Sequence, residues 1–291
     1  MTGKIDVKDE LLRIAEDLRP KGKGFVSVLE IAHSLGTCVS LRFQNSRSSN
    51  TAQIDFRSRP PKILVFRFCQ SEGEHEINWR EENLLSPRER FSVAHELGHW
   101  LLFSRFDTEP QSDERLYWAQ EDTVNAFAAH LLLPDWLARD WLEGTADDSP
   151  ISPFALRFWA TQNRVSEEVV VKALARQRSS IGFLKLFPTQ RKRDGKPVLQ
   201  VLASASGGDV RLPNERSHID SGKLWNALQD KKVGTDWFSQ LQLGRCAPQN
   251  LYVAWRRGNR VGAEEVTWVS LLKRDTKPDK SEMAPPPRLF A

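Results

Sequence analysis

The chain has 291 residues, of which 40% are hydrophobic and 27% charged, with a net charge of +4. This composition is typical of globular proteins with a sizeable core, and the length predicts two domains. No run approaches the roughly 20 apolar residues of a membrane-spanning helix, and the first residues lack the apolar stretch of a secretory signal. Three cysteines without close pairing or metal-type spacing favour a reducing cytoplasm: Cys38, Cys69 and Cys246.

The charge is unevenly distributed along the chain. Residues 1–178 carry 23 Lys and Arg against 27 Asp and Glu, a net charge of −4, whereas residues 179–291 carry 19 against 11, a net charge of +8. A basic half can meet nucleic acid or an acidic partner. Because its basic residues are scattered, apart from 191–193 and 256–257, a solvated basic surface is the preferred interpretation.

The first elements are helices followed by short strands. A polar helix is expected over 8–18 and a second helix over 26–35, where apolar residues recur at helical spacing and Gly36 can cap the end. Three β-prone runs then follow, separated by turn-forming residues: 38–43, 51–56 and 62–68. These runs predict a small sheet that leads into the next helix.

That next helix carries the most informative motif of the chain. Residues 86–89 read Ser-Pro-Arg-Glu, with a serine N-cap, proline at the first helical position and glutamate at the third. Residues 95–99 then read His-Glu-Leu-Gly-His. Positions i and i+4 of a helix differ by only about 40° of rotation, so both imidazoles project from one face. They can hold one metal ion, each at about 2.0–2.1 Å for zinc, with Glu96 beside the ion as a base.

The setting of the motif decides between a metal site and a packing role. One stripe at helical spacing contains Phe91, His95, Gly98, His99 and Leu102, so the histidines are expected to interrupt an apolar, inward-looking face. Gly98 costs about 1 kcal/mol relative to alanine, but it leaves space for another element to approach closely. Two core histidines satisfied by hydrogen bonds are the alternative, and the metal interpretation is preferred.

A third metal ligand is expected from the following helix, beyond a connecting loop or short helix at 105–120. Glu121 begins a core-facing stripe that continues through Val124, Asn125, Ala128, Leu131 and Leu132. An unpaired carboxylate is costly to bury there, and coordination to a cation would remove that cost. Asp122 and His130 point away from this face, and a partly exposed helix histidine is the preferred interpretation of His130. Asn125 can orient a ligand or simply pack.

These two segments together resemble a known family. Residues 90–99, followed by the pattern of residues 121–134, are similar to the ImmA/IrrE family of zinc metallo-endopeptidases. Val124 stands where the family usually has alanine and Leu133 where it usually has methionine, and both changes are conservative. The resemblance is specific across about 88–134.

The resemblance implies a site, a fold and a partner. The family's zinc ligands fall on His95, His99 and Glu121, and its catalytic glutamate falls on Glu96. The implied fold is α+β, a gluzincin-like HExxH peptidase domain, and the implied cofactor is Zn²⁺. The implied substrate is a partner transcriptional repressor, cleaved in a stress response or in mobile-element control. The strand at 62–68 would bind such a substrate edge-on, a hypothesis from strand order alone.

Helices are expected after Pro134, at 135–143 and as a pair within 152–178. Ser166 caps the second helix of the pair, which has the outline of a helix-turn-helix. Glu167 and Glu168 begin its would-be recognition helix, where DNA phosphates would repel them. A structural pair is therefore preferred over a DNA reader.

The remaining sequence is rich in predicted strands. These are 181–187, 198–205, 250–256 and 264–272, with a turn between the last two at Gly258-Asn259. Helices are expected at 221–230 and 235–243. The module loosely resembles the GAF-like sensor domains that some IrrE proteins carry, although no ligand motif stands out in it.

The predicted organisation is a zinc metallopeptidase domain at 1–150, a helical extension at 151–178, an α+β sensor-type domain at 179–275 and a disordered tail at 276–291. The predicted function is zinc-dependent cleavage of a partner protein. Two alternatives stay open: a DNA-binding regulator whose metal is structural, and a module that senses a small molecule or protein, with proteolysis latent. An intact Glu96 argues against a purely structural metal, since structural zinc sites usually have four protein ligands.

Overall fold

The structure is a computed structural model that describes residues 6–20, 24–46, 51–106, 114–191, 194–220, 222–261, 264–275 and 277. The chain forms two compact units, Met1–Pro134 with Thr161–Ser166 and Asp135–Ala160 with Glu167–Ala291. Helices and strands occur in both units, so the predicted α+β class is confirmed. The predicted tail at 276–291 lies outside the described residues, apart from residue 277.

The first unit contains a four-stranded sheet of order β2-β3-β1-β4. Its strands are β1 (Cys38–Gln44), β2 (Ala52–Asp55), β3 (Lys62–Phe68) and β4 (Gly73–Glu76). Three of them were predicted, but β4 was not, because all four of its residues are exposed and carry no apolar alternation. β3 pairs with β1 in parallel and with β2 antiparallel. The hypothesis that strand 62–68 binds a peptide at its edge is therefore wrong, since both of its edges are occupied.

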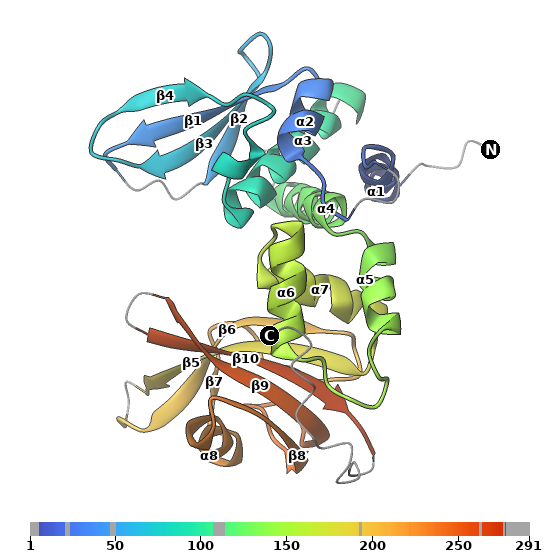
Figure 1. The fold of residues 1–291 in the computed structure, drawn as a ribbon, viewed down its shortest axis with the longest axis vertical. Coiled ribbons are helices and arrows are strands. Elements are labelled where there is room, and N and C mark those ends of the chain that lie inside the picture. The colour runs from blue at the N-terminus through green and yellow to red at the C-terminus, as the bar shows by residue number, and fades with distance from the viewer. Residues whose placement is uncertain are drawn as a thin grey trace, which may run out of the picture. The chain divides into compact units, whose positions relative to one another are not determined.

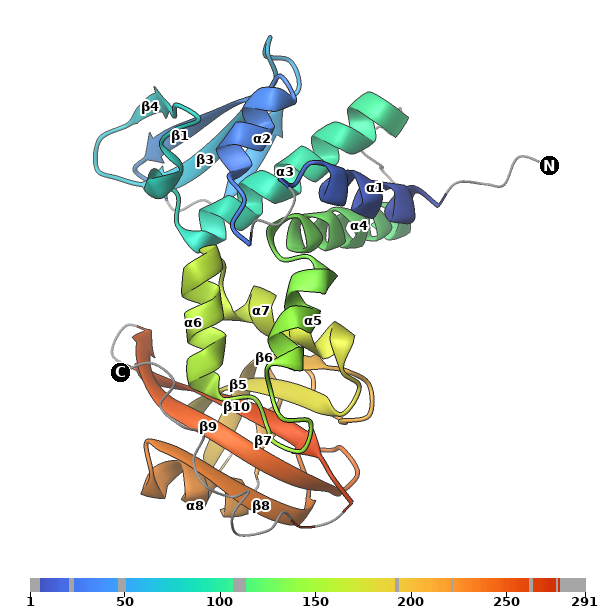
Figure 2. The same ribbon diagram turned by 45° about the vertical axis from the view of Figure 1, so that its right-hand side comes forward.

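The described residues of this unit also form the helices α1 (Val7–Asp17), α2 (Val28–Ser34), α3 (Pro87–Phe106) and α4 (Glu114–Leu132) and the 3₁₀ helix η1 (Glu82–Leu84). α3 packs against β2, β3 and α4, and α1 packs on α4 (Figures 1 and 2). The expected connecting segment at 105–120 is shorter than predicted, because α4 already begins at Glu114. Glu121 therefore lies about two turns inside a helix, where its backbone is held on both sides.

The second unit is built on a six-stranded antiparallel sheet of order β7-β6-β5-β10-β9-β8. The strands are β5 (Ile181–Gln190), β6 (Pro197–Ser206), β7 (His218–Ile219), β8 (Val233–Leu241), β9 (Gln249–Val261) and β10 (Glu264–Lys273). The helix predicted at 235–243 is wrong, because this stretch pairs with β9 as an edge strand. Gly234 belongs to the same strand, and a side chain there would collide with the indole of Trp255.

The turn predicted at Gly258-Asn259 is also wrong. β9 continues to Val261, and the register with β10 shifts between Val266 and Thr267, so the glycine falls at a bulge. The two strands are joined through residues 262–263, which lie outside the described residues. A glycine inside a strand often marks such a bulge, which a sequence pattern does not separate from a hairpin turn.

Helices cover both faces of the second sheet (Figure 1). The helices of this part of the chain are α5 (Asp135–Glu143), α6 (Pro153–Asn163), α7 (Glu167–Gln177) and α8 (Gly222–Asp230). Of these, α7 and α8 pack on the strands, and α5 packs on α7. On one face, Leu224 and Leu228 of α8 belong to the buried cluster that includes Leu184. On the other face, Lys185 forms an ion pair with Glu168 of α7 at 2.6 Å. Because neighbouring strand residues point to opposite faces, this alternation places α7 and α8 on opposite sides of the sheet.

The structure also bears on the predictions about membrane-spanning helices and cysteines. None of the helices in the described ranges combines the length and hydropathy needed to cross a membrane. The three cysteines are free thiols, as their spacing indicated.

Candidate metal centre

The start of α3 is fixed by its own residues and by the sheet. The Glu89 backbone N–H donates to Ser86 Oγ at 3.3 Å, and the Glu89 carboxylate accepts from the Ser86 N–H at 2.7 Å. This reciprocal pair is the capping box that the sequence predicted. Arg67 of β3 donates to the same carboxylate at 2.6 and 2.9 Å. The first turn of α3 is therefore attached to the sheet.

The two motif histidines lie at the border of the buried face of α3. The fully buried stripe consists of Arg90, Val93, Ala94, Leu97, Gly98 and Leu101. The side chains of His95 and His99 are 16% and 25% exposed. Gly98 and Leu102 of the predicted stripe are buried and the two histidines are mostly buried, so the prediction of an inward-looking face is confirmed in part. Their border position leaves them accessible to a ligand from solvent while one side of each ring is packed.

Gly98 is the point of closest approach between α3 and α4. A Cβ added at Gly98 would lie 3.1 Å from Val124 Cβ and 3.1 Å from Phe127 Cδ1. Both distances are shorter than the roughly 3.5–4.0 Å of ordinary carbon contacts. The predicted close approach of another element is confirmed, and that element is the helix that carries Glu121.

This approach brings three donor side chains together. Glu121 Oε2 lies 3.3 Å from His95 Nε2, Glu121 Oε1 lies 3.2 Å from His99 Nε2, and the two Nε2 atoms are 3.2 Å apart. Two ligands of a tetrahedral zinc ion with bonds of about 2.0–2.1 Å would be separated by about 3.3–3.4 Å. The donor set and its spacing thus fit three corners around one zinc ion. Within the described ranges, no second group of His, Cys, Asp or Glu side chains has a comparable arrangement.

Asn125 orients one of these rings. Its Oδ1 lies 3.1 Å from His95 Nδ1, one helical turn from Glu121 on α4. An amide oxygen only accepts hydrogen bonds, so Nδ1 carries the proton and Nε2 presents its lone pair to the other donors. Of the two roles that the sequence left open for Asn125, the contact supports orientation of a ligand.

The electrostatics of the site favour neutral imidazoles. Burial lowers the pKa of His95 and outweighs the opposite effects of Glu121 and Asn125. Burial also lowers the pKa of His99, and His95 adds to that effect. A neutral imidazole is the form that ligates metals, so both rings are in the required state at neutral pH.

Glu96 occupies a separate position beside the donor cluster. Burial raises the pKa of Glu96 to about 7. The nearby Glu121 carboxylate also raises this pKa, whereas the hydrogen bond from the Ile54 N–H lowers it. That N–H, from β2, donates to Glu96 Oε2 at 3.0 Å. The carboxyl group is therefore held between α3 and the edge strand β2, with a pKa suited to proton transfer near neutral pH.

The two weaker candidates lie elsewhere. Asp122 is exposed on α4, as its direction predicted. His130 is buried, at 8% exposure, so its expected partial exposure is wrong. Its Nε2 lies 3.0 Å from Glu16 Oε1 of α1, which explains how a polar ring is accommodated there.

A buried ion pair near the start of α3 escaped the sequence analysis. Arg90 is completely buried, and its Nε donates to Glu82 Oε1 at 2.5 Å. The other carboxylate oxygen of Glu82 accepts from Ser27 Oγ and the Leu29 N–H, both at 3.0 Å. The only signal in the sequence was a charged residue, Arg90, at helical spacing from Val93 and the apolar stripe beyond it.

The same arginine binds backbone carbonyls that are distant in the sequence. Its Nη1 donates to the carbonyls of Asn163 at 2.9 Å and Arg164 at 2.5 Å, and its Nη2 donates to that of Val26. Arg164 has a left-handed backbone, with φ of 50°. Since that conformation is costly for a residue other than glycine, the contacts from Arg90 help to stabilise it.

With this geometry established, comparison with protein families gives one match. Residues 79–175 match the IrrE N-terminal-like domain of peptidase family M78. The segment includes α3, α4 and all four motif residues, so the resemblance to the ImmA/IrrE family is confirmed over this part of the chain. The match supports a peptidase. Comparison with curated proteins finds no match.

Proposed function

We propose that the chain is a zinc-dependent endopeptidase of gluzincin-like HExxH architecture that cleaves a partner protein. His95, His99 and Glu121 hold the ion, and Glu96 is the general base. The observation that carries the proposal is the mutual spacing of the three donors, 3.2–3.3 Å, on two packed helices. Bound Zn²⁺ would supply a Lewis acid and would lower the pKa of a water from about 16 toward about 7.

Glu96 performs the proton transfers of this proposal. The Ile54 N–H fixes Oε2, which leaves Oε1 to accept the proton of the attacking water. The protonated carboxyl group then donates that proton to the amine of the departing peptide.

β2 is the strand that would receive the substrate. The Thr51 carbonyl accepts from the Phe66 N–H of β3, so in this antiparallel pair residues 51, 53 and 55 face β3. The backbone N–H and carbonyl of Ala52 and the carbonyl of Ile54 therefore face the free edge, whereas the Ile54 N–H is already donated to Glu96. We infer that an extended segment of the partner adds to this edge, with its scissile carbonyl near the donor cluster.

The nature of the partner rests on family resemblance alone. A transcriptional repressor, cleaved in a stress response or in mobile-element control, stays a prediction. The division of the chain at 150, 178 and 275 and the GAF-like sensor character of 179–275 also stay predictions.

The DNA-binding alternative is disfavoured by the surroundings of α7. Its side chains are buried along most of its length: Val169, Val170, Val171, Ala173, Leu174 and Ala175. Glu167 pairs with Arg256 at 2.9 Å, and Glu168 pairs with Lys185. A recognition helix must present its first turns to the major groove, but here those turns are attached to the sheet of the same unit.

The proposal is tested by comparing the chain with its Glu96→Gln variant. Both proteins are expressed with candidate repressors, and new amino termini are identified by mass spectrometry. We expect new termini with the unmodified chain and none with Glu96→Gln, although both retain zinc. Glu143→Gln, at an exposed site on α5, is the control and should cleave normally. His99→Ala should lose the metal. Normal cleavage by Glu96→Gln would show that another group is the base, and no new termini with the zinc-loaded chain would refute the endopeptidase.

A further inference from the structure

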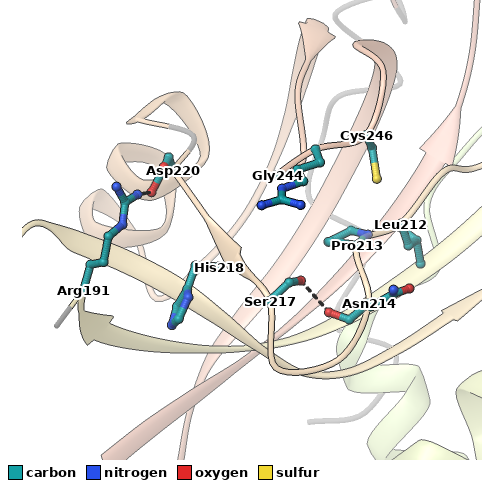
Figure 3. Close-up of a pocket in the computed structure, with 10 residues that line it drawn as sticks. Arg191, Leu212, Pro213, Asn214, Ser217, His218, Asp220, Gly244 and Cys246 are labelled. Atoms are coloured by element: carbon teal, nitrogen blue, oxygen red, sulfur yellow. Dashed lines mark hydrogen bonds and ion pairs between the residues drawn. The ribbon is translucent and has the colours of Figure 1, made fainter. Parts of the chain in front are cut away.

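A cavity of about 670 Å³ lies in the second compact unit. Its walls come from Arg191 just after β5, the segment that leads into β7, Asp220 just after β7, and the turn after β8 (Figure 3). Small-molecule sites in proteins commonly have volumes of about 300–1,000 Å³. This cavity has no part in the proposed peptide hydrolysis, because none of its lining residues belongs to the donor cluster or to β2.

A glycine forms one wall by allowing a close approach. Gly244 has a left-handed backbone with φ of +62°, and an added Cβ would lie 3.4 Å from the His218 carbonyl oxygen and 3.7 Å from Pro213 Cβ. The turn after β8 can therefore run close to β7 without a side chain between them.

A second wall is fixed by hydrogen bonds. The buried Gln249 side chain accepts from the Arg211 N–H at 2.7 Å and donates to the Arg211 carbonyl at 2.8 Å. A few residues further on, both the backbone N–H and Oγ of Ser217 donate to the Asn214 carbonyl. The wall between Arg211 and Ser217 is thus held at both ends, so the cavity is formed before any ligand binds.

The two arginines of the cavity differ in their partners. Arg191 forms ion pairs with Asp220 and, at 3.3 Å, with Asp194, and these pairs fix its guanidinium group. Arg245 has no ion-pair or hydrogen-bond partner among the described residues, and neither does the His218 ring. Because the two aspartates hold Arg191, the Arg245 guanidinium is the charged group left to a ligand, and it favours an anion over a neutral or cationic ligand.

The cavity is not charged throughout. Figure 3 shows Arg191 and Asp220 at one end and Leu212 and Cys246 at the other. Pro213 is buried beside Leu212, and burial raises the pKa of the Cys246 thiol, which keeps it neutral. A ligand that fills the cavity would therefore have a charged group and an apolar body.

We propose that this cavity binds a small organic oxyanion, a carboxylate or a phosphate monoester. Its acidic group contacts Arg245, and its apolar body packs against Leu212 and Pro213. Guanidinium groups bind both kinds of oxyanion through paired hydrogen bonds, so the shared chemistry is the recognition of an oxyanion.

The test is a ligand-observed NMR titration of the full chain at constant ionic strength. Benzoate, phenyl phosphate and the neutral benzyl alcohol are titrated in turn. The variant Arg245→Gln removes the available guanidinium, and Arg139→Gln removes an exposed arginine on α5 of the same unit, outside the cavity. We expect at least one of the two anions to bind the unmodified chain and Arg139→Gln equally, and Arg245→Gln about tenfold to a hundredfold more weakly.

Preference for benzoate or for phenyl phosphate would identify the acidic group. Three results would overturn the proposal: binding of neither anion at millimolar concentration, equal binding of benzyl alcohol, or unchanged affinity of Arg245→Gln. Loss of peptidase activity would not bear on it, because the titration does not depend on cleavage.

Discussion

Replacement of Gly98 by alanine tests whether the spacing of α3 and α4 determines the metal site. The added Cβ would lie 3.1 Å from Val124 Cβ and 3.1 Å from Phe127 Cδ1, and these are tight contacts. The Phe127 ring can turn away, but Val124 Cβ is bonded directly to the backbone. Relief of that contact to about 3.5 Å therefore requires the helices to separate by about 0.4 Å.

A separation of this size affects the site more than the fold. Both histidine ligands lie on α3, whereas Glu121 is the donor from α4. Metal–ligand distances tolerate about 0.2 Å, so a shift of about 0.4 Å should weaken zinc binding by about 10- to 100-fold. Alanine also favours the helix by about 1 kcal/mol over glycine, which partly offsets an overpacking cost of about 1–3 kcal/mol. The free energy of unfolding should therefore change by no more than about 2 kcal/mol.

Zinc affinity is measured by competition with a chromophoric chelator, and the free energy of unfolding by urea titration. Gly73→Ala is the matched control, because Gly73 in β4 has open space where the new methyl group would lie. It should bind zinc like the unmodified chain. If Gly98→Ala also bound zinc with unchanged affinity, the close approach at Gly98 would not set the geometry of the donors.

Three further changes test the surroundings of the site. Arg90→Met should lower the free energy of unfolding by about 3–5 kcal/mol, measured with urea, because it leaves the buried Glu82 carboxylate unpaired; a loss below about 1 kcal/mol would contradict this. Asn125→Ala should reduce zinc affinity by about 10- to 100-fold in the chelator assay with little change in unfolding, and unchanged affinity would exclude the orienting role. Burial raises the pKa of Glu89, but hydrogen bonds from Arg67 and Ser86 outweigh it and hold the pKa below its ordinary value. The Glu89 carboxylate therefore stabilises the fold above its unfolded pKa of about 4.3, and this contribution disappears as the pH falls through the lower folded value. Glu89→Gln should reduce the dependence of the free energy of unfolding on pH in this acidic range. An unchanged dependence would refute the stabilising role of the Glu89 carboxylate.

Local patterns predicted the parts of the site that depend on local geometry. The capping box at Ser86 and Glu89 fixed the start of α3, and the spacing of His95 and His99 placed both rings on one side. Glu121 could also be predicted from the sequence, because a carboxylate on an apolar stripe requires a partner.

Features that depend on distant pairing were missed or wrong. The stretch 235–243 contains no strong β alternation, and its state is decided by pairing with β9. The edge position of β2 follows from the order of the sheet, which the sequence does not specify. Strand propensity reflects the neighbours of a strand as much as its own residues, which explains both errors.

The buried network around Arg90 explains how a helix can hold ligands in place. Glu89 attaches the first turn of α3 to Arg67 of β3, and Arg90 attaches the same turn to Glu82. An α-helix rises about 1.5 Å per residue with a fixed rotation, so anchoring that turn determines where the next two turns project their side chains. Glu96 then meets the Ile54 N–H at the free edge of β2. The network thus sets the position of the site residues on α3. Its loss should displace Glu96 from that edge without changing which side chains can bind the metal.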